Sequence, residues 1–585
     1  MITLPKGITQ HFANAFGLCL AALLALGPLE LRDSLPLGPL HLTTTELLAA
    51  LTATVGILAT LLGFFGQPSD RPQVSLRALK WPLLALFLWA LVHMASATWA
   101  SADRGYVAKA ALRIAGQTTL AGLAAYWASH AGFRRRAMGG AVLGLAIITL
   151  LGTAERLLGR GAEFIFLQFR DEPTWMLGEQ RLSTVFYHAN TCAAYLELTA
   201  PLLLVAASAP GQNRWRRAGL LLWAALVAVL LSLTYSRAGL LAGMVGALAL
   251  AWAARWQPDP RRWRLIAIGY ALLVLVAYAA NPDMRARIGL DDRSYRPQYQ
   301  WLAGCVGHPG DHVQVPLQIR NRGAWDLANR QAPAHVVHTW LTRTGHQLVD
   351  AWDYTAMPDL PAGATITVAL PLELPNRTGE FVVAADIMRD RVLRVSGVGA
   401  PLALLNCTVV AADQPLPPPD GHPIDVSRFD AVRAWRGMDL ERRHYWRAAV
   451  LLWERKPWLG WGSDRFALIH REYVPSQGYD PRARAHSLLL ETAVDLGLLG
   501  VAVLALLLVV VGRAVRLAFR RGWGSDRGAA LAIAAGLCGL IVHSAVDFFF
   551  GYTQIAVVVW PLIGLLLGLQ ATLDEPATAP AASPP

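Results

Sequence analysis

The sequence is poor in charged residues for its length. Only 16% of its 585 residues are Asp, Glu, Lys or Arg, and 54% are hydrophobic. A soluble domain usually has about a quarter of its residues charged. This shortage excludes a soluble globular protein as the description of the whole chain, and it indicates a protein with much of its surface in lipid.

Cysteine is also scarce, with five residues in the chain. Cys19, Cys192 and Cys538 lie in apolar stretches, where a free thiol behaves as a small core residue. Cys305 and Cys407 lie in the one long polar stretch. They could form a disulfide across its base if that stretch faces an oxidising compartment.

The hydrophobic residues gather in blocks of about 20, the length at which a helix crosses a hydrocarbon core of roughly 30 Å. Twelve such helices are predicted, although two nearly fused pairs leave eleven or thirteen open. The first block has no small-x-small cleavage site after it, so we interpret it as a retained helix. The approximate spans are 13–30, 44–66, 81–98, 108–127, 137–157, 189–208, 217–234, 237–254, 264–281, 486–512, 528–546 and 549–570.

The net charge of +12 comes from basic residues in alternate loops, which is the positive-inside pattern and needs no nucleic acid. It predicts cytoplasmic termini. It places the 158–188 loop, the 235–236 turn and the 282–485 insertion on the outer face. The basic residues are Arg71, Arg77, Lys80, Arg134, Arg135, Arg136, Arg214, Arg216, Arg217, Arg255, Arg261, Arg262, Arg264, Arg513, Arg516, Arg520, Arg521 and Arg527.

Residues 301–415 change to alternating stretches separated by turns, which predicts a small β-sandwich that resembles an immunoglobulin-like module. Its expected strands include 312–319, 336–341, 365–370 and 381–387. A Pro-rich linker at 412–423 ends the module. Three aromatic residues could stack on sugars, although core packing is favoured for at least the first: Trp340, Trp352 and Tyr354.

From 425 to 453 the periodicity predicts an amphipathic helix. Its apolar face carries Met438, Arg442, Tyr445, Ala449 and Leu452, whereas Arg436, Arg443 and Arg447 point the other way. The expected fold is therefore mainly α, a polytopic bundle with an inserted β-sandwich. Its expected parts are 1–300 with the first nine helices, 301–415 with the sandwich, 416–485 with the amphipathic helix, 486–572 with the last three helices, and a disordered tail at 573–585.

The sharpest local signal begins at His486. The sequence reads His486-Ser487, nine further residues, then Gly497-Leu498-Leu499-Gly500. An ionisable side chain at the outer mouth of a transmembrane helix is a candidate functional group. The alternative is a polar interfacial residue that marks the start of the helix.

This string resembles the motif of the O-antigen ligase and O-antigen polymerase superfamily, which is His, then Asn, Ser or Gln, a nine-residue spacer, and Gly-x-x-Gly. The segment from Pro457 to Phe466 resembles the family segment that precedes it. Further similar elements are Arg442 with Trp446, Ser236-Arg237-Ala238-Gly239 with one extra residue, and 181–190. The β-sandwich departs from the family pattern.

The resemblance implies an inverting, metal-independent glycosyltransferase that uses a polyprenyl-pyrophosphate-linked glycan. It assigns the pyrophosphate to Arg237 and Arg442 and the acceptor hydroxyl to His486, with Arg443 and Arg447 as rivals if the helix register differs. Arginine stays protonated and grips phosphate with a planar fork, and a histidine can take a proton near neutral pH. The secondary candidates are Arg181, His188 and Asn190.

The remaining ionisable groups carry weaker signals. Acidic and histidine residues form no cluster with the spacing of metal ligands, so we expect no metal or other cofactor. Glu491 has a poor same-face spacing from His486, and we do not expect it to orient the ring. For His543 and Asp547, buried pairing is favoured over catalysis.

The sequence thus predicts a bacterial inner-membrane enzyme whose active site faces the periplasm and whose partners are a lipid-linked glycan donor and a lipid or glycan acceptor. A ligase and a repeat-unit polymerase share this donor chemistry and stay open. A transporter of lipid-linked sugars predicts mid-helix charges and repeat symmetry, and the sequence has few such charges and no evident repeat. A glycan-binding sensor would not need Arg237, Arg442 and His486 together.

Overall fold

A computed structural model describes most of the chain, and its elements are mainly helical. The sequence-based expectations for 425–439, for Trp352 and for 575–585 concern residues outside the part of the chain that the structure describes. The described residues are 8–37, 40–65, 76–100, 104–170, 175–176, 179–281, 284–285, 295–329, 333–342, 348, 353–389, 393–398, 400–418, 440–473, 483–520 and 527–574.

A long helix lies at each of the twelve apolar blocks. Nine of those within the described residues are long and apolar enough to span a membrane, α1 and α16 are shorter apolar helices, and α4 is less apolar. The count of twelve spans stays a prediction. The helices are α1 (Ile8–Leu26), α2 (Thr44–Phe65), α3 (Lys80–Trp99), α4 (Arg104–Trp127), α5 (Ala131–Leu158), α7 (Ala189–Ser208), α8 (Arg214–Leu233), α9 (Arg237–Ala253), α10 (Pro260–Ala280), α15 (Leu488–Arg520), α16 (Arg527–Ser544) and α17 (Thr553–Asp574).

Two helices form the centre of the bundle. In the most apolar windows of α7 and α17, 94% and 100% of the residues are buried, compared with 22% in α2. A helix that is apolar on all sides and enclosed by protein packs as a core, whereas a peripheral helix leaves leucines for lipid. The loops at the ends of α7 and α17 are therefore held firmly, and they supply parts of the site described below.

The insertion forms two antiparallel sheets and a parallel edge pair around a shared core. One sheet has the strand order β10-β7-β5, and the other has the order β6-β13-β11-β8-β9 with β12 beside β11. Leu317 and Leu370 of the first sheet and Val383 of the second belong to one buried cluster. The bounds are β5 (Pro297–Trp301), β6 (Cys305–Gly307), β7 (His312–Asn321), β8 (Ala334–Thr342), β9 (Asp353–Ala356), β10 (Thr365–Glu373), β11 (Gly379–Arg389), β12 (Leu393–Arg394) and β13 (Ala403–Val409).

The structure joins Cys305 and Cys407 by a disulfide between the paired strands β6 and β13. Trp340 is 6% exposed and packs edge-on against Phe381, so it belongs to the core rather than to a sugar-binding surface. Tyr354 is 42% exposed and lies beside His335. The immunoglobulin-like identity of this module stays a prediction.

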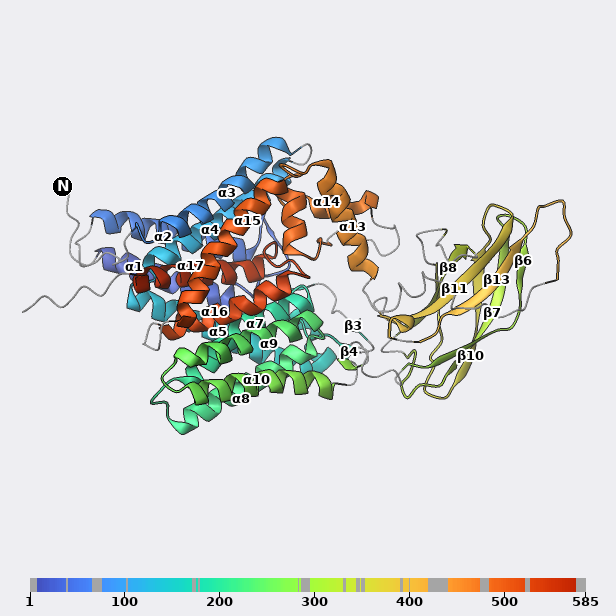
Figure 1. Cartoon of the computed structure of the whole chain (residues 1–585), viewed down its shortest axis with the longest axis horizontal. Coiled ribbons are helices and arrows are strands. Elements are labelled where there is room, and N and C mark those ends of the chain that lie inside the picture. Colours follow the sequence, from blue (N-terminus) through green and yellow to red (C-terminus); the bar gives the residue numbers. More distant parts are fainter. Residues whose placement is uncertain are drawn as a thin grey trace, which may run out of the picture.

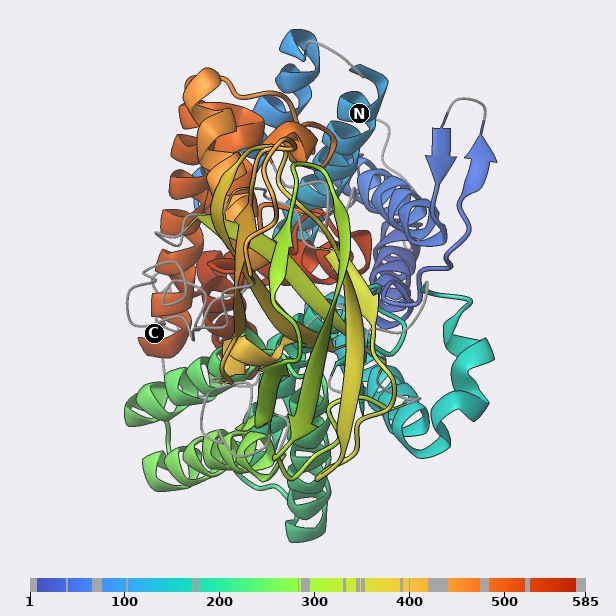
Figure 2. The ribbon, with the colours of Figure 1, turned by 90° about the vertical axis from the view of Figure 1, so that its right-hand side faces the viewer.

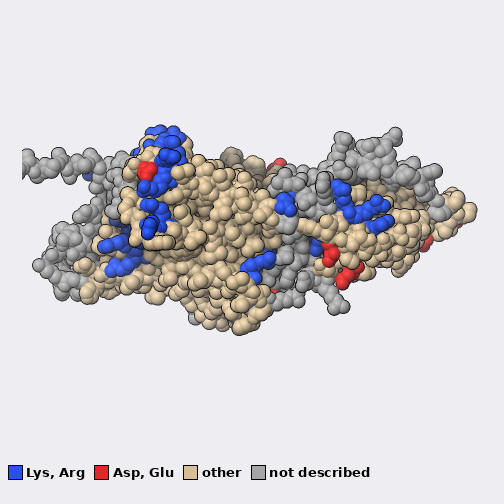
Figure 3. All heavy atoms as spheres, turned by 90° about the horizontal axis from the view of Figure 1, so that it is seen from below, with Lys and Arg blue, Asp and Glu red and all other residues tan. Residues whose placement is uncertain are grey.

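The β module lies beyond one end of the helical bundle, with α13 (Leu440–Arg455) and α14 (Phe466–Ile469) on the same side (Figure 1). Seen along the long axis, the strands lie in front of the helices (Figure 2). A band of Lys and Arg crosses the opposite end of the bundle (Figure 3). Exposed arginines lie at the start of α8, between α9 and α10, and at the start of α10; they include Arg214, Arg216, Arg255 and Arg261.

Candidate functional site

The loop between α16 and α17 places one carboxylate among several of the predicted site residues. Asp547 is 4% exposed. Its Oδ1 lies 3.1 Å from Nδ1 of His486, and its Oδ2 accepts a hydrogen bond of 2.8 Å from the Asn190 amide. Nη2 of Arg442 lies 3.7 Å from the same Oδ2. Four segments that are distant in sequence therefore meet at Asp547.

A second bonded step extends this network. The guanidinium of Arg181 donates to Oδ1 of Asn190 at 2.8 Å and to the carbonyl of Thr234 at 2.9 Å. Arg181 thus connects Asp547, through Asn190, to the turn that precedes Arg237. His188 precedes α7 without a side-chain capping bond, and its ring packs edge-on against those of Tyr187 and Tyr552.

Arg237 is the first residue of α9, and its side chain is exposed. Ser236 caps the helix by accepting a hydrogen bond from the backbone of Gly239 at 3.1 Å. A cation is disfavoured in the first turn of a helix, where the macrodipole is positive. The charge of Arg237 therefore does not stabilise α9, and its exposed guanidinium beside a helix N-terminus suits an anion.

Helix α13 covers His486 with the face that the periodicity predicts. Tyr445, Ala449 and Leu452 are buried, and the Tyr445 ring lies 5.7 Å from the ring of His486. The indole of Trp446 donates to the carbonyl of His486 at 3.4 Å. Arg442 lies one turn before Trp446 and is 26% exposed in its side chain. Arg447 is exposed, and the side chains of Arg436 and Arg443 lie outside the described residues.

Helix α15 is broken at Gly497, which has a φ of 63°. Around the break, main-chain groups bond to the loop before α14 instead of to the helix. Leu498 N donates to the Pro457 carbonyl at 2.7 Å, and Trp461 N donates to the Val494 carbonyl at 2.9 Å. A side chain at position 497 would overlap the carbonyl of Trp458. The first glycine of the motif is therefore required by both its φ and this close approach.

Two buried carboxylates of α15 fix two segments of the chain that precede His486. Asp495 accepts hydrogen bonds from the backbone of Asp464, Arg465 and Phe466 at 2.7, 3.1 and 3.3 Å. Glu491 accepts a hydrogen bond of 2.6 Å from the backbone of Ala485. Glu491 therefore holds the peptide before His486 and does not hold its ring, as the sequence spacing predicts.

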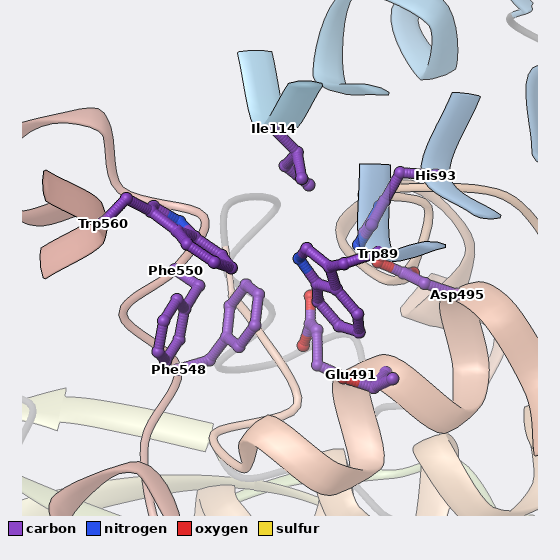
Figure 4. A pocket seen from close by; sticks show the side chains of 9 residues that line it. Trp89, His93, Ile114, Glu491, Asp495, Phe548, Phe550 and Trp560 are labelled. Carbon is purple, nitrogen blue, oxygen red and sulfur yellow. The ribbon is translucent and has the colours of Figure 1, made fainter. Parts of the chain in front are cut away.

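A small cavity lies next to these carboxylates, behind the loop that carries Asp547 (Figure 4). Its volume is about 20 Å³, which is room for about one water molecule. It is too small for a sugar, so it belongs to the support of the site. It is lined by Trp89, His93, Ile114, Glu491, Thr492, Asp495, Phe548, Phe550 and Trp560.

Strained backbone is concentrated around this region. Within the described residues, the non-glycine residues with positive φ are Thr184, Tyr235, Asp464 and His486. Each such residue costs of order 1–3 kcal/mol, and such strain tends to persist at functional sites. Thr184 and Tyr235 flank the elements that carry Asn190 and Arg237, and Asp464 precedes α14. The residues with a strained backbone therefore lie in the same loops as the residues whose side chains meet at the site.

Asp547 is an anion in this arrangement. Burial by itself raises the pKa of its carboxyl, but the hydrogen bond with His486 and the electrostatic attraction of His486 and Arg442 outweigh burial, so the pKa lies well below its ordinary value. A carboxylate only accepts hydrogen bonds. Nδ1 of His486 therefore carries the hydrogen, and in the neutral ring the lone pair lies on Nε2.

The structure brings together Arg181, Asn190, Arg442 and His486, and it adds Asp547, for which the sequence favoured buried pairing over catalysis. His543 is paired within the bundle, with Glu197 at 3.0 Å. The only sequence signal for Asp547 is a carboxylate in a short loop between two apolar helices. No group of three or more His, Cys, Asp or Glu side chains among the described residues could hold a metal ion.

One comparison with known protein families matches the part of the chain that contains this site. The family model for O-antigen ligase matches residues 431–505, which include α13, the loop before α14, His486 and the break in α15. The match confirms the resemblance to the O-antigen ligase superfamily. Residues 431–505 are thus similar to the O-antigen ligase family, in a mainly helical chain whose described part has nine helices long and apolar enough to span a membrane.

Two further comparisons add nothing to the assignment. No curated protein matches this chain. One solved structure that matches is the Pseudomonas fluorescens alkylpurine DNA glycosylase AlkC bound to DNA containing an abasic site analog, at 12% identity over 57% of this chain and 99% of that chain. Its TM-score is 0.16, so neither the fold nor the function of this chain follows from it.

Proposed function

We propose that this chain is a membrane glycosyltransferase that moves a glycan from a polyprenyl-pyrophosphate carrier to an acceptor hydroxyl on the outer face of a bacterial inner membrane. The observation that carries the proposal is the contact of Asp547 with both His486 and Arg442. One carboxylate thereby holds a candidate base beside a candidate phosphate-binding cation. The matched family segment supports the same assignment.

His486 would be the residue that handles the proton. Asp547 holds its Nδ1–H, which leaves Nε2 to take the proton from the acceptor hydroxyl. The hydroxyl oxygen then attacks the anomeric carbon, the bond from that carbon to the pyrophosphate oxygen breaks, and the carrier pyrophosphate leaves with the electron pair. Asp547 would stabilise the imidazolium that forms, and direct displacement would invert the anomeric configuration.

Arg237 and Arg442 would stabilise the leaving group. Fixed positive charge lowers the barrier most where negative charge develops, which is on the departing pyrophosphate. Arg442 is partly exposed and makes only a long ion pair with Asp547, so it can turn towards a phosphate without leaving a fully buried bond. The exposed Arg237 lies at a helix N-terminus, where backbone N–H groups also favour an anion.

The acceptor and the product length define the alternatives. A ligase would join the glycan to a lipid or protein acceptor, and a polymerase would join repeat units to one another. In either case the β module, which we propose to be immunoglobulin-like, would lie in the periplasm beside the site. The chain would cross the membrane twelve times, with both termini in the cytoplasm. A transporter of lipid-linked sugars would form no glycosidic bond.

The test measures glycan transfer from a polyprenyl-pyrophosphate-linked glycan. The purified protein is reconstituted in lipid, and chelator is present. We expect a glycosidic product from the wild type and none from His486→Ala or Arg237→Ala, while Arg447→Ala, an exposed arginine of α13, stays active. The size of the product separates ligase from polymerase. Transfer that is unchanged in His486→Ala and Arg237→Ala, or absent with every acceptor tried, would contradict the proposal.

A further inference from the structure

A second chain of buried polar side chains lies beneath the turn that carries Arg237. Nδ1 of His543 lies 3.0 and 3.1 Å from the two carboxylate oxygens of Glu197, and Nε2 lies 3.5 Å from the hydroxyl of Ser236. His543 is fully buried, and Glu197 and Ser236 are 2% and 3% exposed. The three residues come from α16, α7 and the N-cap of α9. The transfer chemistry proposed above does not use Glu197 or His543.

Ionisable side chains inside a membrane bundle are costly, and they are retained where they serve a specific arrangement. The hydrogen-bond roles in this chain are mutually consistent. The Glu197 carboxylate accepts from Nδ1–H of His543, so Nε2 can accept from the Ser236 hydroxyl. The Ser236 oxygen still accepts from the backbone of Gly239 as the helix cap. The side chain of Ser236 is thereby fixed from two directions.

The backbone of Ser236 is fixed as well. Its carbonyl accepts a hydrogen bond of 2.8 Å from the Tyr278 hydroxyl, and its N–H donates to the Thr234 hydroxyl at 3.3 Å. Tyr235, next to it, has a φ of 54°, a conformation that a non-glycine residue holds only when its surroundings impose it. Arg237 follows directly, so the direction in which it leaves the turn depends on these bonds.

We propose that Glu197 and His543 are positioning residues for the donor, because they hold Ser236 and thereby set where the Arg237 guanidinium can reach. The ring of His543 also packs edge-on against Phe549 at 4.6 Å, in the loop that carries Asp547. One buried histidine thus connects the turn of Arg237 to the loop of Asp547. This inference rests on the proposed function and deepens it.

The arrangement matters because Arg237 is a cation at the positive end of a helix. Without the bond from His543, the strained turn could relax and move the guanidinium away from the helix N-terminus. A displacement of about 1 Å in a group that binds the reacting phosphate can cost about 100-fold in rate. The effect should therefore fall on the donor more than on the acceptor.

The test measures binding of farnesyl diphosphate, as a probe for the donor, to the full-length protein in lipid nanodiscs, together with KM and kcat for the lipid-linked glycan. We expect Glu197→Leu to weaken probe binding at least tenfold and to lower kcat/KM for the lipid-linked glycan at least tenfold, with the KM for the acceptor changed less than threefold. Glu197→Gln should bind within threefold of the wild type, because its amide oxygen still accepts from Nδ1–H. Thr199→Val is the matched control, since Thr199 is buried in the same helix and its hydroxyl donates to the Tyr195 carbonyl within that helix.

A second variant keeps the test valid if Glu197→Leu does not fold. Ser236→Gly removes the hydroxyl that meets His543 at little cost as a helix cap, and the same selective loss of donor binding is expected. In an Arg237→Ala background, Glu197→Leu should weaken probe binding no further. Equal weakening in both backgrounds, or wild-type binding by Glu197→Leu and Ser236→Gly, would overturn the positioning role alone. Failure of the wild type to bind the probe, or unchanged binding by Arg237→Ala, would instead overturn the proposed function.

Discussion

The side-chain amide of Asn190 donates a hydrogen bond of 2.8 Å to Asp547, although 357 positions separate the two residues in the sequence. The same carboxylate also contacts His486, just before α15, and Arg442 of α13. Asp547 belongs to no recognised motif, yet the motif residues His486 and Arg442 both contact it. We therefore expect the negative charge of Asp547 to be required for transfer.

Asp547→Asn should abolish most of the transfer while leaving donor binding nearly intact. The amide keeps a hydrogen-bond acceptor for His486 but removes the negative charge that stabilises an imidazolium. General-base catalysis contributes about 100- to 10,000-fold, so we expect kcat to fall about 100-fold or more. The measurement is kcat with saturating donor beside farnesyl diphosphate binding. Asp353→Asn, at an exposed position of β9, is the control, and a kcat within threefold of the wild type in Asp547→Asn would refute the role.

Arg442→Ala and Arg447→Ala should differ sharply. The two residues lie on the same helix, but Arg442 reaches Asp547 and Arg447 is exposed away from it. A hydrogen bond to a charged group contributes about 1.5–3 kcal/mol, so we expect the donor KM to rise about 10- to 100-fold in Arg442→Ala. Arg447→Ala should stay within twofold. Donor titrations of both variants decide the register of α13, and a reversed result would assign the phosphate to Arg447.

Gly497→Ala should destabilise the protein and stop transfer. An L-residue in the left-handed region costs roughly 1–2 kcal/mol, and the added methyl would also overlap the Trp458 carbonyl. Gly512→Ala is the matched control in the same helix, because a side chain there meets no atom within 4 Å, and it should be neutral or stabilising by about 0.5–1 kcal/mol. Thermal unfolding in detergent would measure both. Equal midpoints for the two variants would show that the break in α15 is not required.

The β module should lose stability as the pH falls below about 6.5. Burial lowers the pKa of His338, and the nearby Asp353 offsets this only in part. The unfolded chain then binds a proton that the folded module does not, so the free energy of unfolding decreases towards acid, by at most about 1.4 kcal/mol per pH unit. Urea unfolding followed by tryptophan fluorescence at pH 7 and pH 5 measures the slope. His338→Leu should flatten it and His312→Gln, at an exposed position, should not; a slope that persists in His338→Leu would assign it to other groups.

Hydropathy located the helices well because each apolar block has to satisfy its backbone internally in lipid. Alternation located β7, β8, β10 and β11, since these strands are long and have a regular burial pattern or a continuous apolar run. The strands β5, β6, β9 and β13 were not predicted. Three of them have five residues or fewer, whereas β13 has seven residues and alternates in burial; pairing with neighbouring strands stabilises all four.

Only the site residues that stand in local sequence motifs could be predicted from the sequence. His486, Arg442 and Arg237 stand in motifs, and the roles given to them stay proposals. Asp547 and Glu197 could not be assigned, because their partners lie 61 to 357 positions away. Buried pairing was expected for His543, and its partner is Glu197 on another helix, which the sequence could not name.

The break in α15 has a mechanical consequence. At Gly497 the peptide groups that would have joined the two halves of the helix bond to residues 457–462 instead. The short half that follows His486 is therefore coupled to the loop before α14 and to α13, while the long half exposes apolar side chains such as Leu508 and Val509. If the long half spans the bilayer, we expect thinning or tilting of the bilayer to bend it about this joint and to leave the distance from His486 to α13 unchanged.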